Sequence, residues 1–146
     1  MDISSEQSEH FKNLSKITNF FQRTSESGLL FCVCTNQALV RQVNEQIKAR
    51  TDSLGLDIRE LYISSDDMDN FIPIIRQAAN EKPNGIIVNN LDELILVSKG
   101  SFLEGMNLAR EILLDLDIPM LFWLSERNVS LFANKAQDLF RRRDRG

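Results

Sequence analysis

The stretch that comes closest to a catalytic motif is "NGIIVNNLDEL", residues 84–94, in which an apolar run leads into two amides and two acids. Magnesium-dependent phosphate hydrolysis uses carboxylates at such a strand end to hold the metal and to orient water. Asn89 and Asn90 occupy those positions here, and Asp92 follows. An amide accepts hydrogen bonds but cannot neutralise Mg²⁺ or take up a proton. We interpret Asn89, Asn90 and Asp92 as degenerate metal and water positions. The alternative is that the amides only satisfy loop backbone groups, with Asp92 and Glu93 capping a helix or facing solvent.

A phosphate-binding loop is also missing after the first apolar run, "LLFCVCTNQ". Such a loop needs glycines, whose backbone N–H groups wrap the phosphates, and a lysine followed by Ser or Thr. Neither glycine nor lysine occurs between Gly28 and Lys48, which removes the dinucleotide-binding glycine pattern as well. Thr35 and Asn36 could contact an anion at a helix N-terminus. Helix capping is the plainer role for both residues.

The chain also lacks the residues that other common catalytic sites require. The only histidine is His10, in a polar N-terminal stretch, which argues against Ser–His or Cys–His catalysis. Cys32 and Cys34 share one face if their run is a strand, and we interpret them as buried free thiols in a reducing compartment. We expect no bound metal and no cofactor.

The elements that must position these residues alternate along the chain. Apolar residues at helical spacing predict an N-terminal helix over 10–23, and β-prone runs then alternate with helical patterns. The predicted strands cover 29–35, 56–64, 85–90 and 118–125, and the helices that follow them cover 36–55, 65–85, 101–117 and 128–143. This alternation predicts an α/β fold, a three-layer α/β/α sandwich with a mostly parallel sheet of about four strands. We expect residues 1–9 to be a flexible N-terminus and residues 10–146 to form a single α/β domain.

Composition limits the partners. The net charge of −4 over 146 residues argues against a general nucleic-acid surface. The exception is the tail, where an arginine cluster forms either a solvated helix end or a contact to acidic protein, lipid or nucleic acid. The cluster consists of Arg141, Arg142, Arg143 and Arg145. No apolar run approaches the roughly 18 residues of a membrane helix, and the N-terminus lacks signal-peptide features. We expect a cytoplasmic protein without a membrane partner.

The order of parts resembles the core of P-loop ATPases of the AAA and STAND type. Beside that family's apolar–Asp–Glu–x–Asp strand, "IIVNNLD" matches in shape, and "MLFWLSERN" is similar to the family's sensor strand. A closer likeness covers residues 106–140, which are similar to a stretch of bacterial STAND-like proteins. The positions that match its motif are Asn107, Arg110, Trp123 and Asp138.

The resemblance implies a P-loop-NTPase-like fold and an inactive member used as a module in multidomain conflict or signalling proteins. We therefore expect a pseudo-ATPase that is not an enzyme. It would act as a protein–protein adaptor in a bacterial antiviral defence or signalling assembly, and its partners could include further copies of itself. Contacts could use the leading helix, with Phe11, Phe20 and Phe21, or the arginine tail. One alternative is a nucleotide sensor that binds without hydrolysis, through backbone N–H groups after Thr35 together with an arginine such as Arg110 or Arg127. The other is a nucleic-acid adaptor that uses the tail.

Overall fold

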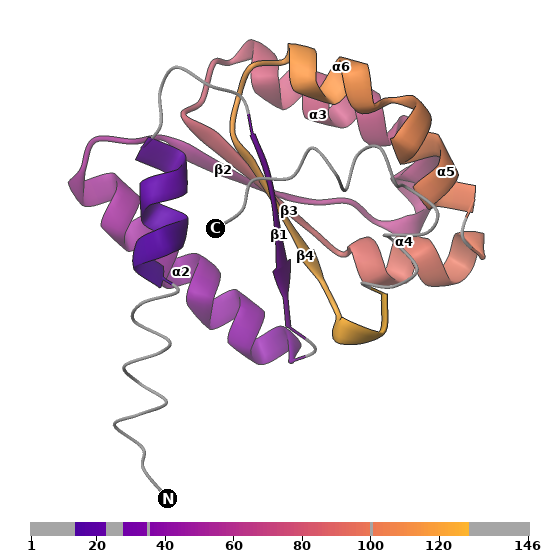
Figure 1. Ribbon diagram of the computed structural model, residues 1–146, viewed down its shortest axis with the longest axis horizontal. Helices are drawn as coiled ribbons and strands as arrows, with labels where there is room; N and C mark the ends of the chain where they lie inside the picture. Colours follow the sequence, from indigo (N-terminus) through magenta and orange to yellow (C-terminus); the bar gives the residue numbers. More distant parts are fainter. Residues whose placement is uncertain (1–13, 23–27, 35, 100, 129–146) are drawn as a thin grey trace, which may run out of the picture.

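The computed structural model describes residues 14–22, 28–34, 36–99 and 101–128, and its centre is a four-stranded sheet (Figure 1). All neighbouring strands are parallel, and the order across the sheet is β1-β4-β3-β2. The strands are β1 (Leu29–Val33), β2 (Ile58–Tyr62), β3 (Gly85–Asn89) and β4 (Met120–Leu124). The predicted α/β class with a parallel sheet of four strands is confirmed.

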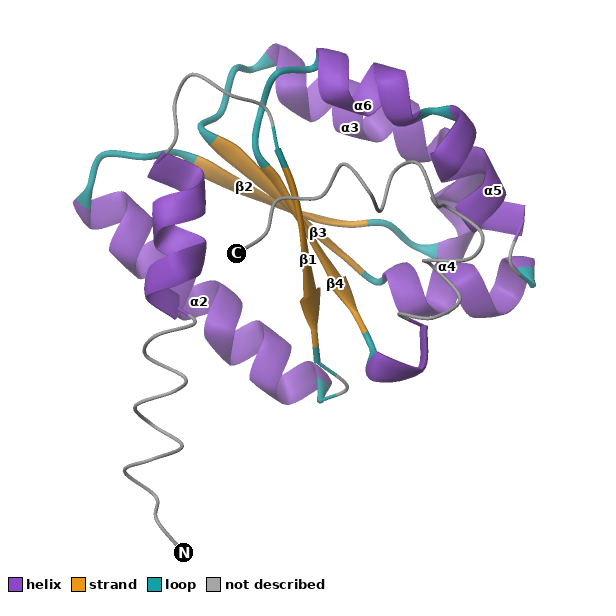
Figure 2. Cartoon of the chain, in the orientation of Figure 1, coloured by secondary structure: helices purple, strands orange, loops and turns teal. Residues whose placement is uncertain are grey.

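Helices cover both faces of this sheet, so the fold has three layers (Figure 2). One face packs against the helical segment 14–22 and α2 (Gln37–Ser53). The opposite face packs against α3 (Phe71–Asn80), α4 (Leu91–Ser98), α5 (Ser101–Leu108) and α6 (Arg110–Asp115). Successive strand residues point to opposite layers, because side chains alternate along a strand: Ile86 and Val88 join one core, and Ile87 joins the other.

The handedness of the connections and the strand order together determine which face each helix covers. Connections between parallel strands are right-handed. When the chain reverses the direction in which it moves across the sheet, the next connecting helix must therefore lie on the opposite face of the sheet. The chain leaves β1 through α2 and crosses to the far edge at β2; it then returns through β3 and β4 over the opposite face. Among the described strands β1 is therefore an edge, whereas the first strand lies inside the sheet in the dinucleotide-binding and flavodoxin-like orders.

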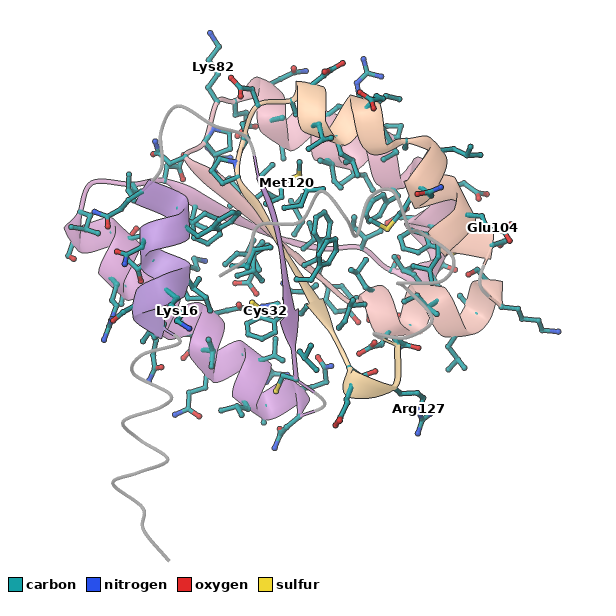
Figure 3. The ribbon with its side chains drawn as sticks, viewed as in Figure 1. Lys16, Cys32, Lys82, Glu104, Met120 and Arg127 are labelled. Atoms are coloured by element: carbon teal, nitrogen blue, oxygen red, sulfur yellow. The ribbon has the colours of Figure 1, made fainter. Side chains whose placement is uncertain are left out.

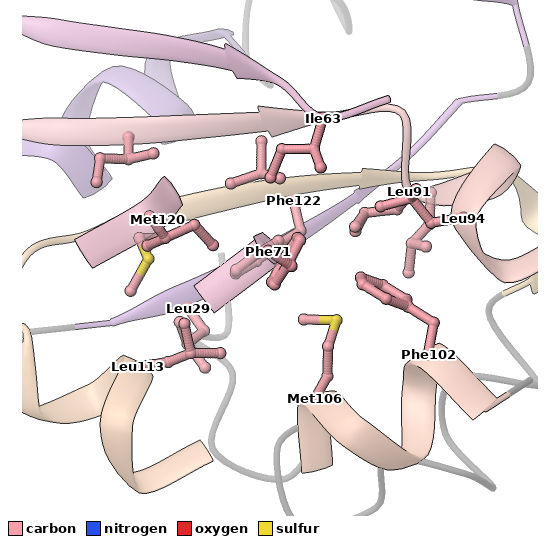
Figure 4. Close-up of a cluster of buried hydrophobic side chains, with 14 of the residues drawn as sticks. Leu29, Ile63, Phe71, Leu91, Leu94, Phe102, Met106, Leu113, Met120 and Phe122 are labelled. Atoms are coloured by element: carbon pink, nitrogen blue, oxygen red, sulfur yellow. The ribbon is translucent and has the colours of Figure 1, made fainter. Parts of the chain in front are cut away.

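The larger core lies between the sheet and the layer of α3 to α6 (Figure 4). Strands β3 and β4 are buried along their whole length, which explains why Asn89 at the end of β3 is the only polar side chain in the two strands. Phe71 of α3 meets Phe102 of α5 edge to face, with ring centroids 4.8 Å apart. Each large side chain buried here stabilises the fold by roughly 1.5–3 kcal/mol relative to an exposed one.

The connection from β3 to β4 differs from its prediction. A single helix was expected over 101–117, but the chain forms three helices, because α4 precedes that range and Ala109 separates α5 from α6. Two non-glycine residues in the left-handed region, Asn90 (φ 78°) and Lys99 (φ 55°), bound α4. The helix predicted over 65–85 is likewise divided: residues Ser65–Asn70 form the 3-10 helix η1, and α3 follows.

The N-terminal helical segment belongs to the core. Its apolar residues Leu14, Ile17, Phe20 and Phe21 are all buried in the cluster on the α2 face. The expectation that Phe20 and Phe21 form a contact surface is therefore wrong, because the sheet and α2 cover them. Residues 1–13, with His10 and Phe11, and most of the helix predicted over 128–143 lie outside the described residues.

The two cysteines lie on the α2 face, as their spacing predicts, and both are free thiols. They are half-buried rather than fully buried, since Cys32 lies in the edge strand and Cys34 directly follows it. Burial raises the pKa of the Cys32 thiol to about 12, which favours the neutral form.

Within the described part of the chain, no helix combines the length and apolar character needed to cross a bilayer.

Candidate functional site at the carboxyl edge of the sheet

The topology places a candidate site at the carboxyl end of β4. The loop leaving β1 leads to the α2 face, and the loop leaving β3 leads to the opposite face. Because β4 lies between these two strands, its end lies at the point where the connections diverge. Open parallel sheets bind ligands at such a point.

Asn89 ends β3 and points toward α2, where it is buried. Its side-chain nitrogen donates to Glu60 Oε2 at 3.0 Å and to the Leu61 carbonyl at 3.2 Å, both on the neighbouring strand. Its side-chain oxygen accepts from Asn44 Nδ2 at 3.0 Å. All three bonds go to the chain itself, so the amide links β3 to β2 and α2.

Asn44 extends this network across the sheet. It lies on the buried side of α2 and donates to Glu60 Oε2 at 3.3 Å as well as to Asn89. Its oxygen accepts from Trp123 Nε1 at 2.8 Å. Trp123 is buried, as its position in a strand predicts, and the Asn44 bond satisfies the polar end of its ring.

Glu60 supplies the one carboxylate of this network. Its Oε2 atom accepts from both amides, and its Oε1 atom lies 3.8 Å from the ammonium group of Lys48 on α2. Both oxygens therefore have partners. Among the described residues, no buried side-chain nitrogen or oxygen lacks a hydrogen-bond partner.

Asn90 turns the chain out of the sheet. Its left-handed backbone (φ 78°) is a conformation that asparagine tolerates better than most residues. The side-chain nitrogen donates to the Ile63 carbonyl at 2.8 Å and to Glu93 Oε2 at 2.6 Å. The residue thereby holds the loop after β2 against the start of α4, while Glu93 is exposed, as expected.

Asp92 bridges to the end of β4 instead of capping a helix or facing solvent. Its Oδ1 atom accepts from the Ser125 backbone N–H at 3.0 Å and from Asn128 Nδ2 at 2.5 Å. On the other side of β4, the Cys34 N–H donates to the Leu124 carbonyl at 2.8 Å. The loops after β1, β3 and β4 are thus joined where a ligand is expected.

The remaining predicted residues are spread over other parts of the molecule. Asn36 is the N-cap of α2, as predicted, and accepts from the Leu39 N–H at 3.1 Å. Arg127 follows β4 and points outward (Figure 3). Asn107 is half-buried on α5, in the layer opposite to Asn89. Arg110 begins α6, but its side chain is not among those described, and Thr35, Asp138, Arg141, Arg142 and Arg143 lie outside the described residues.

Sequence reasoning missed Asn44, Glu60 and Lys48. A signal for Asn44 existed, because it falls at helical spacing between Val40 and Ile47 on the buried stripe of α2. A polar residue in that stripe requires a buried partner. The sequence does not indicate which strand supplies the partner, since that depends on the order of the strands.

The described residues contain no group of three or more His, Cys, Asp or Glu side chains arranged to bind a metal ion. The polar groups that gather at the carboxyl edge are mainly amides and backbone groups, and they bond to one another. Comparisons with protein-family models, curated proteins and solved structures found no match for this chain.

Proposed function

We propose that this chain is a non-catalytic domain with a nucleotide-hydrolase-like arrangement of parts, and that it acts through contacts with other proteins. The observation that carries the proposal is the use of Asn89, Asn90 and Asp92 as ties between neighbouring loops and strands. A group that reacts with phosphate must keep an oxygen or proton available for the substrate. Asn89 uses both of its side-chain polar atoms within the fold, Asn90 uses its side-chain nitrogen, and Asp92 uses its Oδ1 atom.

The alternative uses of this edge lack chemical support. Phosphoryl transfer requires carboxylates for Mg²⁺, a water-orienting group and cations on the phosphates. At the end of β3 the chain has two amides, and the acid that follows holds the β4 loop. The hydrogen bonds at this edge instead connect the loops and strands to one another.

The exposed surface of α4 is our candidate contact region. Leu96 is 75% exposed and its neighbour Val97 is 51% exposed, whereas Leu91, Leu94 and Ile95 of the same helix are buried. Adjacent exposed aliphatic side chains are common at protein interfaces, although single ones are ordinary on any surface. The assignment to a bacterial defence or signalling assembly rests on the resemblance of residues 106–140.

Affinity capture from the native host tests this proposal. The full chain is compared with Leu96→Ser/Val97→Ser and with Leu54→Ser, a matched control that changes a half-exposed leucine at the end of α2. We expect a co-purifying protein that the control retains and the double variant loses at least about tenfold, a difference of about 1.4 kcal/mol. Equal capture by all three would exclude α4 as the contact region, and capture of nothing would argue against the adaptor role.

A further inference from the structure

A groove lies between two elements of the helical layer, with η1 and the start of α3 on one side and α5 on the other. Its volume is about 250 Å³. That is less than the roughly 300–1,000 Å³ of sites that enclose a drug-sized ligand. A pocket of this size instead suits one or two large side chains of a partner, which is how interface anchors are held.

The floor of the groove is apolar. Phe71 and Phe102 line it with the edge-to-face contact described above, and Phe102 and Met106 both point from α5 toward Phe71 (Figure 4). These three side chains are buried, whereas Met68 and Ile72 on the opposite wall are half-buried. Methionine is flexible and polarizable, and it adapts to irregular apolar surfaces. The groove can therefore adjust to an inserted apolar side chain.

Gly105 leaves space on the α5 side of the groove. It is exposed in the middle of the helix, and a Cβ atom added there would meet nothing within 4 Å. Glycine weakens a helix relative to alanine, and the packing around residue 105 does not require so small a residue. A position without a side chain allows the backbone or a side chain of another molecule to approach the helix closely.

Acidic side chains border this apolar floor. Asp69 lines the groove, and Asp66 lies three residues earlier in η1, where residues three apart stack on one side of a 3-10 helix. Glu104 points outward from α5 (Figure 3). All three acids are exposed, and the nearest cations along the chain, Arg76 and Lys99, are not among the residues that line the groove. A bound segment with positive charge beside its apolar anchor would therefore complement the rim.

From these observations we propose that the groove between α3 and α5 docks a basic amphipathic segment of a partner protein. One large apolar side chain of the segment inserts over Phe71 and Phe102, and its lysines or arginines lie beside Asp66 and Asp69. Helices that bind in grooves use apolar anchors in this way. The acidic rim disfavours anionic lipid and nucleic acid, whose phosphates it repels. The inference rests on the proposed role in protein contacts, and it names the kind of partner.

Fluorescence anisotropy of a labelled synthetic peptide, titrated with the full chain, tests the docking directly. The probe is an amphipathic helical peptide with leucines on one face and lysines on the other, and we expect a Kd below about 100 µM. One reference peptide has glutamate in place of lysine, and the other has serine in place of leucine. Each should bind at least about tenfold more weakly, because the first loses the charge match and the second loses the anchor.

Variants of the groove locate the binding. Gly105→Trp should weaken the probe at least about tenfold, because the indole would occupy the space beside α5. Gly105→Ala is the matched control; it adds only a methyl group and should keep the affinity within about twofold. Asp66→Lys/Asp69→Lys should weaken binding several-fold, and because both aspartates are exposed the fold should persist. Circular dichroism of each variant checks the fold.

Three results would overturn the proposal: no saturable binding of the probe, equal binding of the serine peptide, or binding that neither Gly105→Trp nor the aspartate pair changes. The peptide measurement does not involve the native partner, so it is independent of affinity capture. Capture that depends on Leu96 and Val97, together with a groove that binds no peptide, would contradict this inference and leave the adaptor role in place.

Discussion

At the scale of single residues, Asn89 determines what the carboxyl edge can do. Its amide donates to Glu60 and to Leu61 and accepts from Asn44, so each polar atom is used inside the fold. A carboxylate at this position could not donate, and it would lie beside the carboxylate of Glu60. The amide is therefore required for the network, and its presence need not be explained by the loss of an earlier activity.

Asn89→Asp tests that interpretation directly. The change removes two donated hydrogen bonds and adds a negative charge next to Glu60, and we expect it to lower the free energy of unfolding by about 2–4 kcal/mol at pH 7. Repulsion and burial should raise the pKa of the introduced carboxyl group above that of an unfolded aspartate. The protonated form is then favoured in the fold, so the deficit should shrink below about pH 5 and grow as pH rises through the folded pKa.

Urea unfolding at pH 7 and at pH 4.5 measures this effect. Asn84→Asp is the matched control, because Asn84 Oδ1 accepts a bond from the Asp57 N–H at 2.7 Å and a carboxylate keeps that acceptor. We expect the control to change stability by less than about 0.5 kcal/mol. If Asn89→Asp were as stable as the unaltered chain at pH 7, or were stabilised by Mg²⁺, the position would be a metal site and not a tie.

Single residues were predicted unevenly from sequence. The cap at Asn36 and the buried Trp123 follow from local pattern and are confirmed. Asn89 was recognised as unusual, but its partners Asn44 and Glu60 were not, since they are 45 and 29 residues away in sequence. The alternative assignment of Asp92, to a helix cap or to solvent, missed its actual role. The groups that donate hydrogen bonds to it, on Ser125 and Asn128, come from a loop that is distant in the sequence.

At the scale of elements, the contact between the N-terminal helical segment and the start of β3 fixes the position of that helix. A Cβ atom added to Gly85 would lie 2.3 Å from Phe21 Cδ1 and 2.9 Å from Ile58 Cδ1. Phe21 and Gly85 therefore fit against each other, and a side chain at residue 85 would push the helix away from the sheet.

Gly85→Ala should lower the free energy of unfolding by about 1–3 kcal/mol, the usual effect of overpacking a core. The matched control is Gly105→Ala in α5, where a Cβ atom would meet nothing within 4 Å. That change should raise stability by about 0.5–1 kcal/mol, because alanine favours a helix. Denaturant unfolding of both variants gives the comparison. Equal effects of the two substitutions would show that the N-terminal helix does not pack on β3.

The strands were easier to predict than the connection between β3 and β4. Three apolar runs and one alternating stretch, each followed by a polar loop, indicate the strands clearly, and β3 and β4 are fully buried. The break at Ala109 carries no glycine or proline signal. Helix α4 ends at Ser98, and the residue that caps it, Lys99, has a left-handed conformation that is uncommon for lysine. Tertiary packing, which a local pattern does not contain, decides these boundaries.

At the scale of the whole molecule, the order of the strands determines which residues meet. With β4 between β1 and β3, Trp123 reaches Asn44 and Asp92 reaches Ser125. Hydrophobic runs predict a parallel sheet covered on both faces, but they do not give this order. The result is a carboxyl edge where four strands and α2 are linked by hydrogen bonds, and this edge is the basis of the proposed non-catalytic role.

Isothermal titration of the full chain with Mg²⁺–ATP tests this claim most directly. A closed edge predicts no saturable heat up to about 1 mM nucleotide, since that limit corresponds to a binding free energy of only about −4 kcal/mol. One-to-one binding with a micromolar Kd, lost in Asn89→Ala while Asn84→Asp retains it, would contradict the claim and show that the edge binds nucleotide.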